Sequence, residues 1–419
     1  MNANQSQTFQ PFRHSGIRRL AGASALAWIL VSGAPARTWT SADGSKTFEG
    51  ELKSYDPATG MVGVTLANGK TMSFNQSKLA EADVAFLKEQ GKIDPPSSKP
   101  NASGGGISAK SLPDALPDPD GKEADMSKPV QVFIMMGQSN MLGFGNAGQL
   151  MGVAAEKYPY VVDDEGKWNV RKDVRNVFFC MAQLKYNDWL TGENGNGSGK
   201  FGPEIGIGNY LGYAIDAPVM ILKSCVGNRA LGWDLLPPSA VGTGKDGKSY
   251  QGDSESSNRK VSEEAKAKSG GWYAGLQYDQ DVGAAQEALK NLSTYYPGAK
   301  EYEVAGFFWW QGNAEPGKGS VENYDKNLAF LFNDLRKDFN APNAKFVCAT
   351  LGEHDKDAPL SKKMFDFADR PEFKDQAAVF FSKPVAKGSS GGHYGGDAET
   401  YMNVGEGMGR EMVKLLGGK

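Results

Sequence analysis

The stretch from Val130 to Met141 has the residue types to present a catalytic serine. An apolar run, Val130–Met136, ends in Gly137-Gln138-Ser139-Asn140-Met141. Several hydrolases expose a nucleophilic hydroxyl in this way, at the tip of a buried strand that turns into a helix, with backbone N–H groups close to the developing oxyanion. The same residues also fit an ordinary strand-to-helix turn with Ser139 as N-cap. We interpret Ser139 as the candidate nucleophile.

Other segments carry the oxyanion donors that acyl-ester hydrolysis also needs. The backbone N–H groups of Ser139 and Gly227 are candidate donors, and a side-chain amide of Gln311 or Asn313 could complete the hole. Gly227 also fits a plain turn glycine, and the two amides could instead satisfy loop backbone. Gln138 and Trp310 are the candidate substrate contacts; one of Trp309 and Trp310 is expected to line the pocket, where it could stack on a sugar.

A general base is the remaining requirement, and histidine is scarce. The chain has three histidines, His14, His354 and His393. His14 lies in a segment that we expect to be removed. His393 stands in a glycine-rich loop before the last predicted helix and suits a general base. His354 lies among charged residues and is the less favoured candidate.

Together these blocks resemble the SGNH (GDSL-type) hydrolases, in the branch of the sialate O-acetylesterase-like proteins and carbohydrate esterase family 6. The resemblance spans residues 128–418 and rests on Gly137–Met141, Gly202-Pro203-Glu204, the Gly227 loop, Trp310-Gln311-Gly312 and His393. It implies a flavodoxin-like three-layer α/β/α fold and a serine esterase that needs no metal or other cofactor. The implied substrates are O-acetyl groups on carbohydrates.

Two departures from that family leave the triad acid open. The family's acid usually lies three residues before the histidine, where this chain has Ser390, and the family commonly has Glu where this chain has Asn313. Asp397 is the candidate acid, and Glu399 lies near it in sequence. A backbone carbonyl could instead orient the imidazole in a Ser-His dyad. Loss of a triad acid costs about 10⁴ in kcat where the tautomer is wrong.

Alternating apolar strands and helices must position these groups. The predicted strands are Val130–Met136, Asn176–Met181, Pro218–Ser224, Glu303–Trp310, Lys345–Leu351 and Ala377–Phe381. The predicted helices are Glu204–Ile215, Val282–Leu292, Val321–Phe339 and Asn403–Leu416. This order predicts a parallel sheet covered on both faces, with the ligand site beyond the carboxyl ends of the strands. We interpret 239–271 as a surface insertion and candidate lid.

We expect four parts in the chain: a signal peptide (1–36), a small β unit (37–92), a Pro/Gly/Ser-rich linker (93–127) and the esterase domain (128–419). The small unit carries a hairpin with an Asn68-Gly69 turn and a helix over 80–90. With Trp39, Asp43 and Asp83 it resembles the SH3-like barrel named after a homology region in a yeast actin-assembly protein. That resemblance implies a binding or spacer module without a catalytic role, and its partner is not indicated.

Charge and end composition limit the location and the partners. A basic start, an apolar stretch over 20–31 and Ala34-Pro35-Ala36 fit a cleaved signal, so we expect a secreted or periplasmic protein; an uncleaved anchor is the alternative. Cleavage takes the formal net charge from −3 to −6, and no second apolar segment of spanning length follows. Such a product lacks the basic surface typical of nucleic-acid binding. The three cysteines are expected to be buried thiols, and the few histidines disfavour a zinc site.

The sequence therefore predicts an exported esterase acting on acetylated oligo- or polysaccharides through Ser139 and His393. Two alternatives stay open. One is a non-catalytic carbohydrate-binding protein on the same fold, which Ser390 in the acid position would explain. The other is a lipid or aryl esterase on the same scaffold.

Overall fold

The computed structural model falls into two compact units, 1–97 and 98–419, each described here by itself. The structure describes residues 29–30, 37–56, 61–66, 71–90, 107–193, 195–197, 199–240, 243 and 272–418. The predicted signal peptide lies outside these residues apart from 29–30. So do the Asn68-Gly69 turn and nearly all of the predicted insertion over 239–271.

The first unit is an antiparallel sheet with one helix. Its strands are β1 (Ile29–Leu30), β2 (Arg37–Thr40), β3 (Thr47–Asp56), β4 (Met61–Leu66) and β5 (Thr71–Asn75), followed by η1 (Gln76–Lys78) and α1 (Glu81–Gln90). Trp39 is fully buried among apolar side chains of this unit, and its indole N–H donates to the Gly50 carbonyl. The predicted hairpin pairs β4 with β5, and the predicted helix is α1.

The second unit is built on a seven-stranded sheet in the order β14-β13-β12-β6-β11-β8-β9. These strands are β6 (Val130–Gly137), β8 (Val170–Cys180), β9 (Gln183–Thr191), β11 (Val219–Ser224), β12 (Tyr302–Trp310), β13 (Lys345–Ala349) and β14 (Ala377–Phe380). All neighbours pair in parallel except β8 and β9. Without that edge hairpin, five strands follow the order 2-1-3-4-5, whose switch point lies between β6 and β12.

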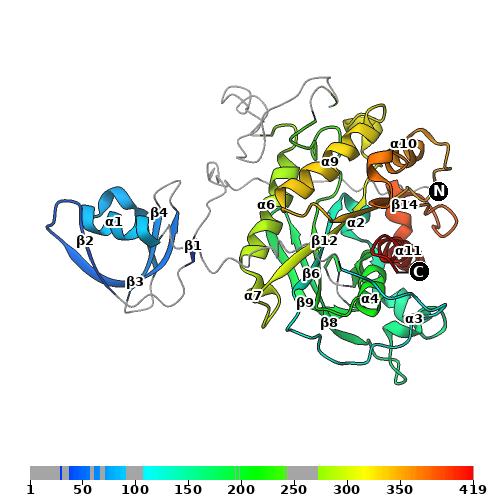
Figure 1. The fold of residues 1–419 in the computed structure, drawn as a ribbon, viewed down its shortest axis with the longest axis horizontal. Coiled ribbons are helices and arrows are strands. Elements are labelled where there is room, and N and C mark those ends of the chain that lie inside the picture. Colours follow the sequence, from blue (N-terminus) through cyan, green and yellow to red (C-terminus); the bar gives the residue numbers. More distant parts are fainter. Residues whose placement is uncertain are drawn as a thin grey trace, which may run out of the picture. The chain divides into compact units, whose positions relative to one another are not determined.

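Helices cover both faces of this sheet (Figure 1), which confirms the predicted parallel sheet between two helical layers. One face packs on α3 (Ala147–Lys157), α4 (Glu204–Ala214) and α11 (Ala398–Leu415). The other packs on α6 (Leu276–Lys290), α7 (Leu292–Tyr295), α9 (Tyr324–Asp338) and α10 (Pro359–Ala368). Along β6, Phe133 and Met135 enter the first core, whereas Ile134 and Met136 enter the second. The apolar run is continuous because both faces of this strand are buried.

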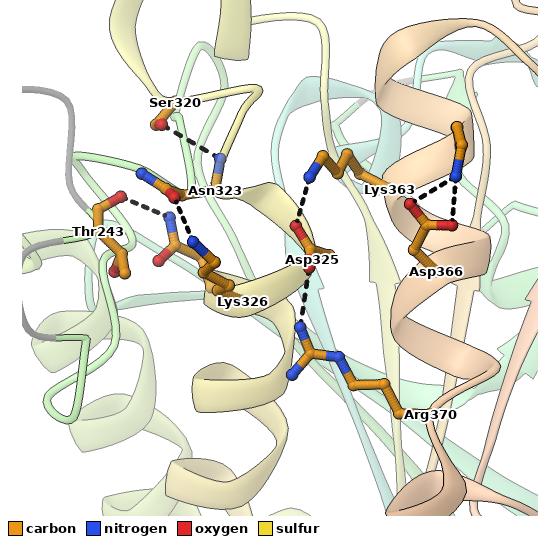
Figure 2. Close-up of polar contacts among 10 residues, drawn as sticks. Thr243, Ser320, Asn323, Asp325, Lys326, Lys363, Asp366 and Arg370 are labelled. Carbon is orange, nitrogen blue, oxygen red and sulfur yellow. Dashed lines mark hydrogen bonds and ion pairs between the residues drawn. The ribbon is translucent and has the colours of Figure 1, made fainter.

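An ion-pair cluster joins two helices of the second layer. Figure 2 shows Asp325 of α9 between Lys363 of α10 and Arg370, which lies just beyond α10. Asp325 Oδ1 lies 2.9 Å from Lys363 Nζ, and Oδ2 lies 2.8 Å from Arg370 Nη2. Because the carboxylate is only 14 % exposed, this cluster is screened less than the surface pairs of the chain.

The remaining short elements are β7 (Gly145–Asn146), which pairs with β10 (Lys200–Phe201), and the turns α2 (Ser139–Leu142), α8 (Glu315–Lys318), η2 (Pro159–Val161), η3 (Pro371–Phe373) and η4 (Ser390–Gly396). The described part of the predicted linker, 107–127, packs against the second unit. Ala109 and Leu116 are buried in the first core, and the Lys110 N–H donates to the Ala214 carbonyl. Residues 107–127 therefore form part of the second unit.

A fully buried ion pair fixes the segment around α2. Lys223 of β11 and Glu204 of α4 have no exposed side-chain surface, and Lys223 Nζ lies 3.0 Å from Glu204 Oε2. The ammonium also donates to the Leu142 carbonyl at the end of α2, and Glu204 Oε1 accepts from the Gly202 N–H. Gly202 lies so close to Gly143 that a β-carbon on Gly143 would be 2.3 Å from the Gly202 Cα. The Gly-Pro-Glu segment is therefore a support for α2.

Glu204→Gln should destabilise the second unit strongly, because it leaves the Lys223 ammonium buried without its counter-charge. We expect the free energy of unfolding to fall by about 3–5 kcal/mol in urea denaturation. Asp216→Asn is the matched control. It removes a carboxylate that is 94 % exposed and pairs with Lys128, so it should change stability by less than about 1 kcal/mol. Equal effects of the two substitutions would contradict this role for the buried pair.

Candidate active site

Ser139 lies at the carboxyl edge of the central strand, as the first residue of α2. The turn that exposes it needs glycine at position 137, where φ is +149° and a β-carbon would be 2.5 Å from the Trp310 carbonyl oxygen. Strand β12 therefore approaches β6 more closely than any side chain would permit. Ser139 is 9 % exposed, so the residue is largely buried at this edge of the sheet.

Gly227 lies next to this serine, on the loop after β11. A β-carbon on Gly227 would be 3.5 Å from the Ser139 Cβ, an ordinary van der Waals distance. The two residues come from neighbouring strands, because β6 and β11 pair in parallel. The structure thus places the Gly227 backbone beside Ser139.

The two amides that follow β12 have different environments. Gln311 has no exposed surface; its Nε2 donates to the Arg229 carbonyl and to Glu315 Oε2, both at 3.0 Å, and its Oε1 accepts from the Tyr324 hydroxyl. Both of its N–H donors are occupied, so the expectation that Gln311 completes an oxyanion hole is wrong. Asn313 is exposed, and its amide group donates to Ser390 Oγ at 3.3 Å.

Glu315 explains why Gln311 is held in this way, and the sequence reasoning missed it. Its carboxylate has no exposed surface and accepts from the N–H groups of Leu231, Gly232 and Ser320 as well as from Gln311. Burial raises the pKa of Glu315, and these hydrogen bonds act in the opposite direction. The side chain joins the loops that follow β11 and β12, on either side of Ser139.

Neither predicted substrate contact faces solvent. Gln138 is 1 % exposed; its Oε1 accepts from the Ala314 N–H at 3.3 Å, which ties the serine turn to the β12 loop. Trp310 has no exposed surface, donates from its indole to the Thr350 carbonyl and stacks on Tyr394 with ring centroids 5.6 Å apart. Trp310 is the last residue of β12, and burial of both faces of this strand leaves its side chain no solvent-facing side. The expectation that either one contacts a sugar is therefore wrong.

His393 lies in η4, whose chain packs against α2. Its φ is +51°, and its ring stacks on Phe144 with centroids 4.0 Å apart and planes 8° from parallel. Burial lowers the pKa of His393, and the Lys200 ammonium lowers it further. The residue borders an open polar pocket of about 580 Å³ that Phe144, Asn146 and Lys200 also line. No hydrogen bond joins Ser139 and His393, both of which the structure describes.

The predicted acid, Asp397, caps a helix. Asp397 is the N-cap of α11, where Oδ2 accepts from the backbone N–H and the hydroxyl of Thr400. Glu399 pairs with Lys157 and Lys387. Neither carboxylate contacts His393, so the expectation that Asp397 is the triad acid is wrong. Helix α11 starts five residues before the predicted helix, and this hid the capping role.

A different carboxylate, Glu353, approaches the turn of His393. It follows β13, and its oxygens accept from the hydroxyl and the backbone N–H of Ser390. The neighbouring His354 is half-buried, and its Nδ1 has no hydrogen-bond partner among the described residues. Because β12 lies between β13 and β6, His354 is one strand further from Ser139 than the β12 loop. The position of Glu353 at the end of a predicted strand was the available sequence signal.

No group of three or more His, Cys, Asp and Glu side chains within the described residues is arranged to hold a metal ion. The structure also has no helix, among the residues that it describes, with the length and apolar character needed to cross a bilayer.

Comparison with known proteins points to carbohydrate esterases. Residues 267–414 match the sequence model of a family described as carbohydrate esterase, sialic acid-specific acetylesterase. This segment contains Asn313 and His393 but neither Ser139 nor Gly227. No curated protein matches the chain significantly. The family match supports an esterase of the carbohydrate acetylesterase type.

Three solved structures are similar to this chain at low sequence identity. A protein from Arabidopsis thaliana is 15 % identical, over 68 % of this chain and 99 % of its own, with a TM-score of 0.42. A carbohydrate acetylesterase from Xanthomonas citri is 16 % identical over 67 % of this chain, which covers 55 % of that protein, with a TM-score of 0.40. NanS is 13 % identical over 63 % and 79 % of the two chains, with a TM-score of 0.35.

A buried carboxyl group contacts the end of β11, three residues before Gly227. Asp281 of α6 accepts from Gln277 Nε2 at 2.8 Å and from the Ser224 hydroxyl at 3.3 Å, both through Oδ1. Its Oδ2 has no partner among the described residues. Burial raises the pKa of Asp281 to about 7, against the effect of the two hydrogen bonds.

Asp281→Asn should remove a pH dependence of stability. Between about pH 4 and pH 7 the unfolded chain loses this proton while the folded chain keeps it, so the free energy of unfolding falls as pH rises. The full effect is on the order of 4 kcal/mol. We expect urea denaturation to show Asp281→Asn gaining stability relative to the unchanged protein between pH 5 and pH 8. A constant difference across that range would contradict the assignment.

Proposed function

We propose that this chain is an exported serine esterase that removes O-acetyl groups from carbohydrates through an acetyl-enzyme. The observation that carries the proposal is the position of Ser139 at the carboxyl edge of the sheet, beside the switch point, with the Gly227 backbone next to it and the turn of His393 packed on α2. The Asn313 amide contacts Ser390 of the same turn. Ligands bind at such a point in open α/β sheets. The family match over 267–414 independently supports an acetylesterase.

In the proposed mechanism the His393 imidazole turns from Phe144 toward Ser139 and takes the proton of its hydroxyl. The lowered pKa of His393 keeps the imidazole neutral, and so able to act as a base, at neutral pH. The serine oxygen attacks the ester carbonyl carbon and a tetrahedral oxyanion forms. The C–O bond to the sugar then breaks, and the sugar oxygen takes the proton from His393. Water, deprotonated by His393, then attacks the acetyl carbon, the bond to the Ser139 oxygen breaks, acetate leaves and Ser139 takes the proton back from His393.

The backbone N–H groups of Ser139 and Gly227 and the side chain of Asn313 are the proposed oxyanion donors. Asn313 uses one N–H toward Ser390 Oγ and keeps a second for substrate. Donors that are fixed before the reaction stabilise the developing charge without reorganisation during it. The exposed position of Asn313, in contrast to Gln311, favours it for this role.

The surroundings of His393 favour a sugar over a long acyl chain. The adjoining pocket is lined by Asn146, Lys200 and several glycines, with Phe144 as its large apolar side chain. Polar side chains with one aromatic face are typical of sugar sites, whereas an acyl chain needs a continuous apolar groove. We also propose that the protein is exported and that its first unit is an SH3-like binding or spacer module.

Ser139→Ala should abolish the release of acetate from an aryl acetate. We expect a loss on the order of 10⁶-fold in kcat, because no other group replaces the nucleophile. Ser293→Ala, at an exposed position on α7, is the control and should keep full activity. Equal release by the Ser139→Ala variant and the unchanged protein would refute the proposal.

The same protein separates the two alternative functions. Glycan binding without labelling of Ser139 by a fluorophosphonate would establish a non-catalytic binding protein. Faster hydrolysis of octanoate than of acetate esters would establish a lipid esterase. Acetate release from a panel of acetylated polysaccharides would then identify the substrate.

Gly227→Ala should reduce activity while the fold is kept. The added methyl group meets Ser139 at an ordinary contact distance of 3.5 Å, so we expect no loss of stability. It does occupy space beside the nucleophile, and we expect kcat/KM to fall by about 10²-fold. Gly283→Ala is the control, because a β-carbon there meets no atom within 4 Å. Full activity of Gly227→Ala would show that the substrate does not occupy the space between Gly227 and Ser139.

A further inference from the structure

A carboxylate from the loop after β13 hydrogen-bonds to Ser390, the residue at the sequence position where the resembling family usually has its triad acid. Glu353 accepts two hydrogen bonds from one residue: Oε1 accepts from the Ser390 hydroxyl, and Oε2 accepts from the Ser390 N–H at 3.0 Å. Both oxygens of this carboxyl group therefore act as acceptors toward one residue. Ser390 is 1 % exposed and Glu353 is half-buried, so this contact is partly shielded from water.

The Ser390 hydroxyl has capacity for one more partner. It donates to Glu353 and accepts from Asn313 Nδ2 at 3.3 Å. A hydroxyl oxygen has two acceptor sites, so one is left for another N–H donor. His393 belongs to the same turn, η4, three residues later. Its Nδ1–H is a suitable donor once the ring leaves Phe144.

Other charged groups around His393 do not offer an acid. Lys200 is a cation, with its ammonium 5.0 Å from the centroid of the Phe144 ring on which His393 stacks. Asp397 is committed to capping α11 and lies 3.8 Å from the Lys387 ammonium. Glu353 is therefore the carboxylate whose hydrogen bonds lead to the turn of His393.

We infer that Glu353, acting through the Ser390 hydroxyl, is a positioning residue for His393. The inference rests on the proposed esterase function. When His393 takes the Ser139 proton on Nε2, its Nδ1–H donates to Ser390 Oγ, and the Ser390 O–H donates to Glu353. No proton moves beyond His393; the chain of hydrogen bonds fixes the tautomer and stabilises the imidazolium. Charge-assisted bonds in a shielded site are stronger than neutral ones.

Glu353→Gln tests the charge and spares the shape. Glutamine keeps one acceptor oxygen for the Ser390 N–H, but its Nε2 must donate to the Ser390 oxygen instead of accepting from the hydroxyl. A purely structural role would therefore lower stability in urea denaturation and leave the pH profile of kcat/KM unchanged. We expect kcat to fall by about 10²–10³-fold with little change in KM, and the acid limb of kcat/KM to move to lower pH, because the imidazolium loses its counter-charge. Asp355→Asn, which removes an exposed carboxylate from the same loop, is the control and should change neither.

Two further variants test the route through Ser390. Ser390→Ala should reproduce the loss of kcat, and Ser390→Asp in the Glu353→Gln background should restore much of it by placing a carboxylate directly beside His393. Unchanged kcat and pH profile in Glu353→Gln would overturn the inference. So would an equal loss in Asp355→Asn.

Labelling of Ser139 by a fluorophosphonate separates this inference from the function on which it rests. An unchanged protein that is labelled at Ser139, together with a Glu353→Gln variant labelled at the same rate, refutes the role of Glu353 alone. An unchanged protein that is neither labelled nor active refutes both the esterase function and the inference. Slower labelling of Glu353→Gln than of Asp355→Asn supports the inference without any knowledge of the natural substrate.

Discussion

The position of the candidate nucleophile depends on the buried ion pair between Lys223 and Glu204. This pair holds three separate parts of the chain: strand β11, the end of α2 through the Leu142 carbonyl, and the start of α4 through the Gly202 N–H. Taking two charges out of water is costly, and only complete pairing with further hydrogen bonds repays it. Loss of either partner leaves the other charge buried and unpaired, so we expect the structure around Ser139 to need both residues.

A second buried carboxylate organises the opposite side of the site. Glu315 gathers N–H groups from the loops after β11 and β12, and it occupies an amide N–H of Gln311. The loops on either side of Ser139 are consequently one hydrogen-bonded structure. Rigid loops of this kind can hold backbone N–H groups toward a developing charge, which is the property that an oxyanion site requires. Asn313, beyond this network, keeps the exposure that substrate contact needs.

The proposed positioning residue Glu353 lies on a different loop from the sequence position where the resembling family has its acid. Ser390 occupies the position where the resembling family has aspartate, and the carboxylate of Glu353 lies against its hydroxyl and N–H. The loop after β13 and the turn of His393 lie at the same edge of the parallel sheet, so Glu353 and Ser390 are close enough to form hydrogen bonds. A side chain lost from one loop can be supplied by its neighbour without a change in the fold.

The sequence by itself determined the doubly wound sheet and the strand end that carries Ser139, because continuous apolar runs and a Gly-Gln-Ser turn are local patterns. It also identified His393 and the amides after β12 as groups at that edge. Only the tertiary structure decided which of them are committed elsewhere. Gln311 and Asn313 have the same chemistry, yet one is buried against Glu315 and the other is exposed. Asp397 is near His393 in sequence but caps helix α11. Glu353 lies forty residues before His393 in sequence, yet it hydrogen-bonds to Ser390 in the turn of His393. Hydrogen-bond commitment depends on neighbours in space, and those are fixed by packing across strands.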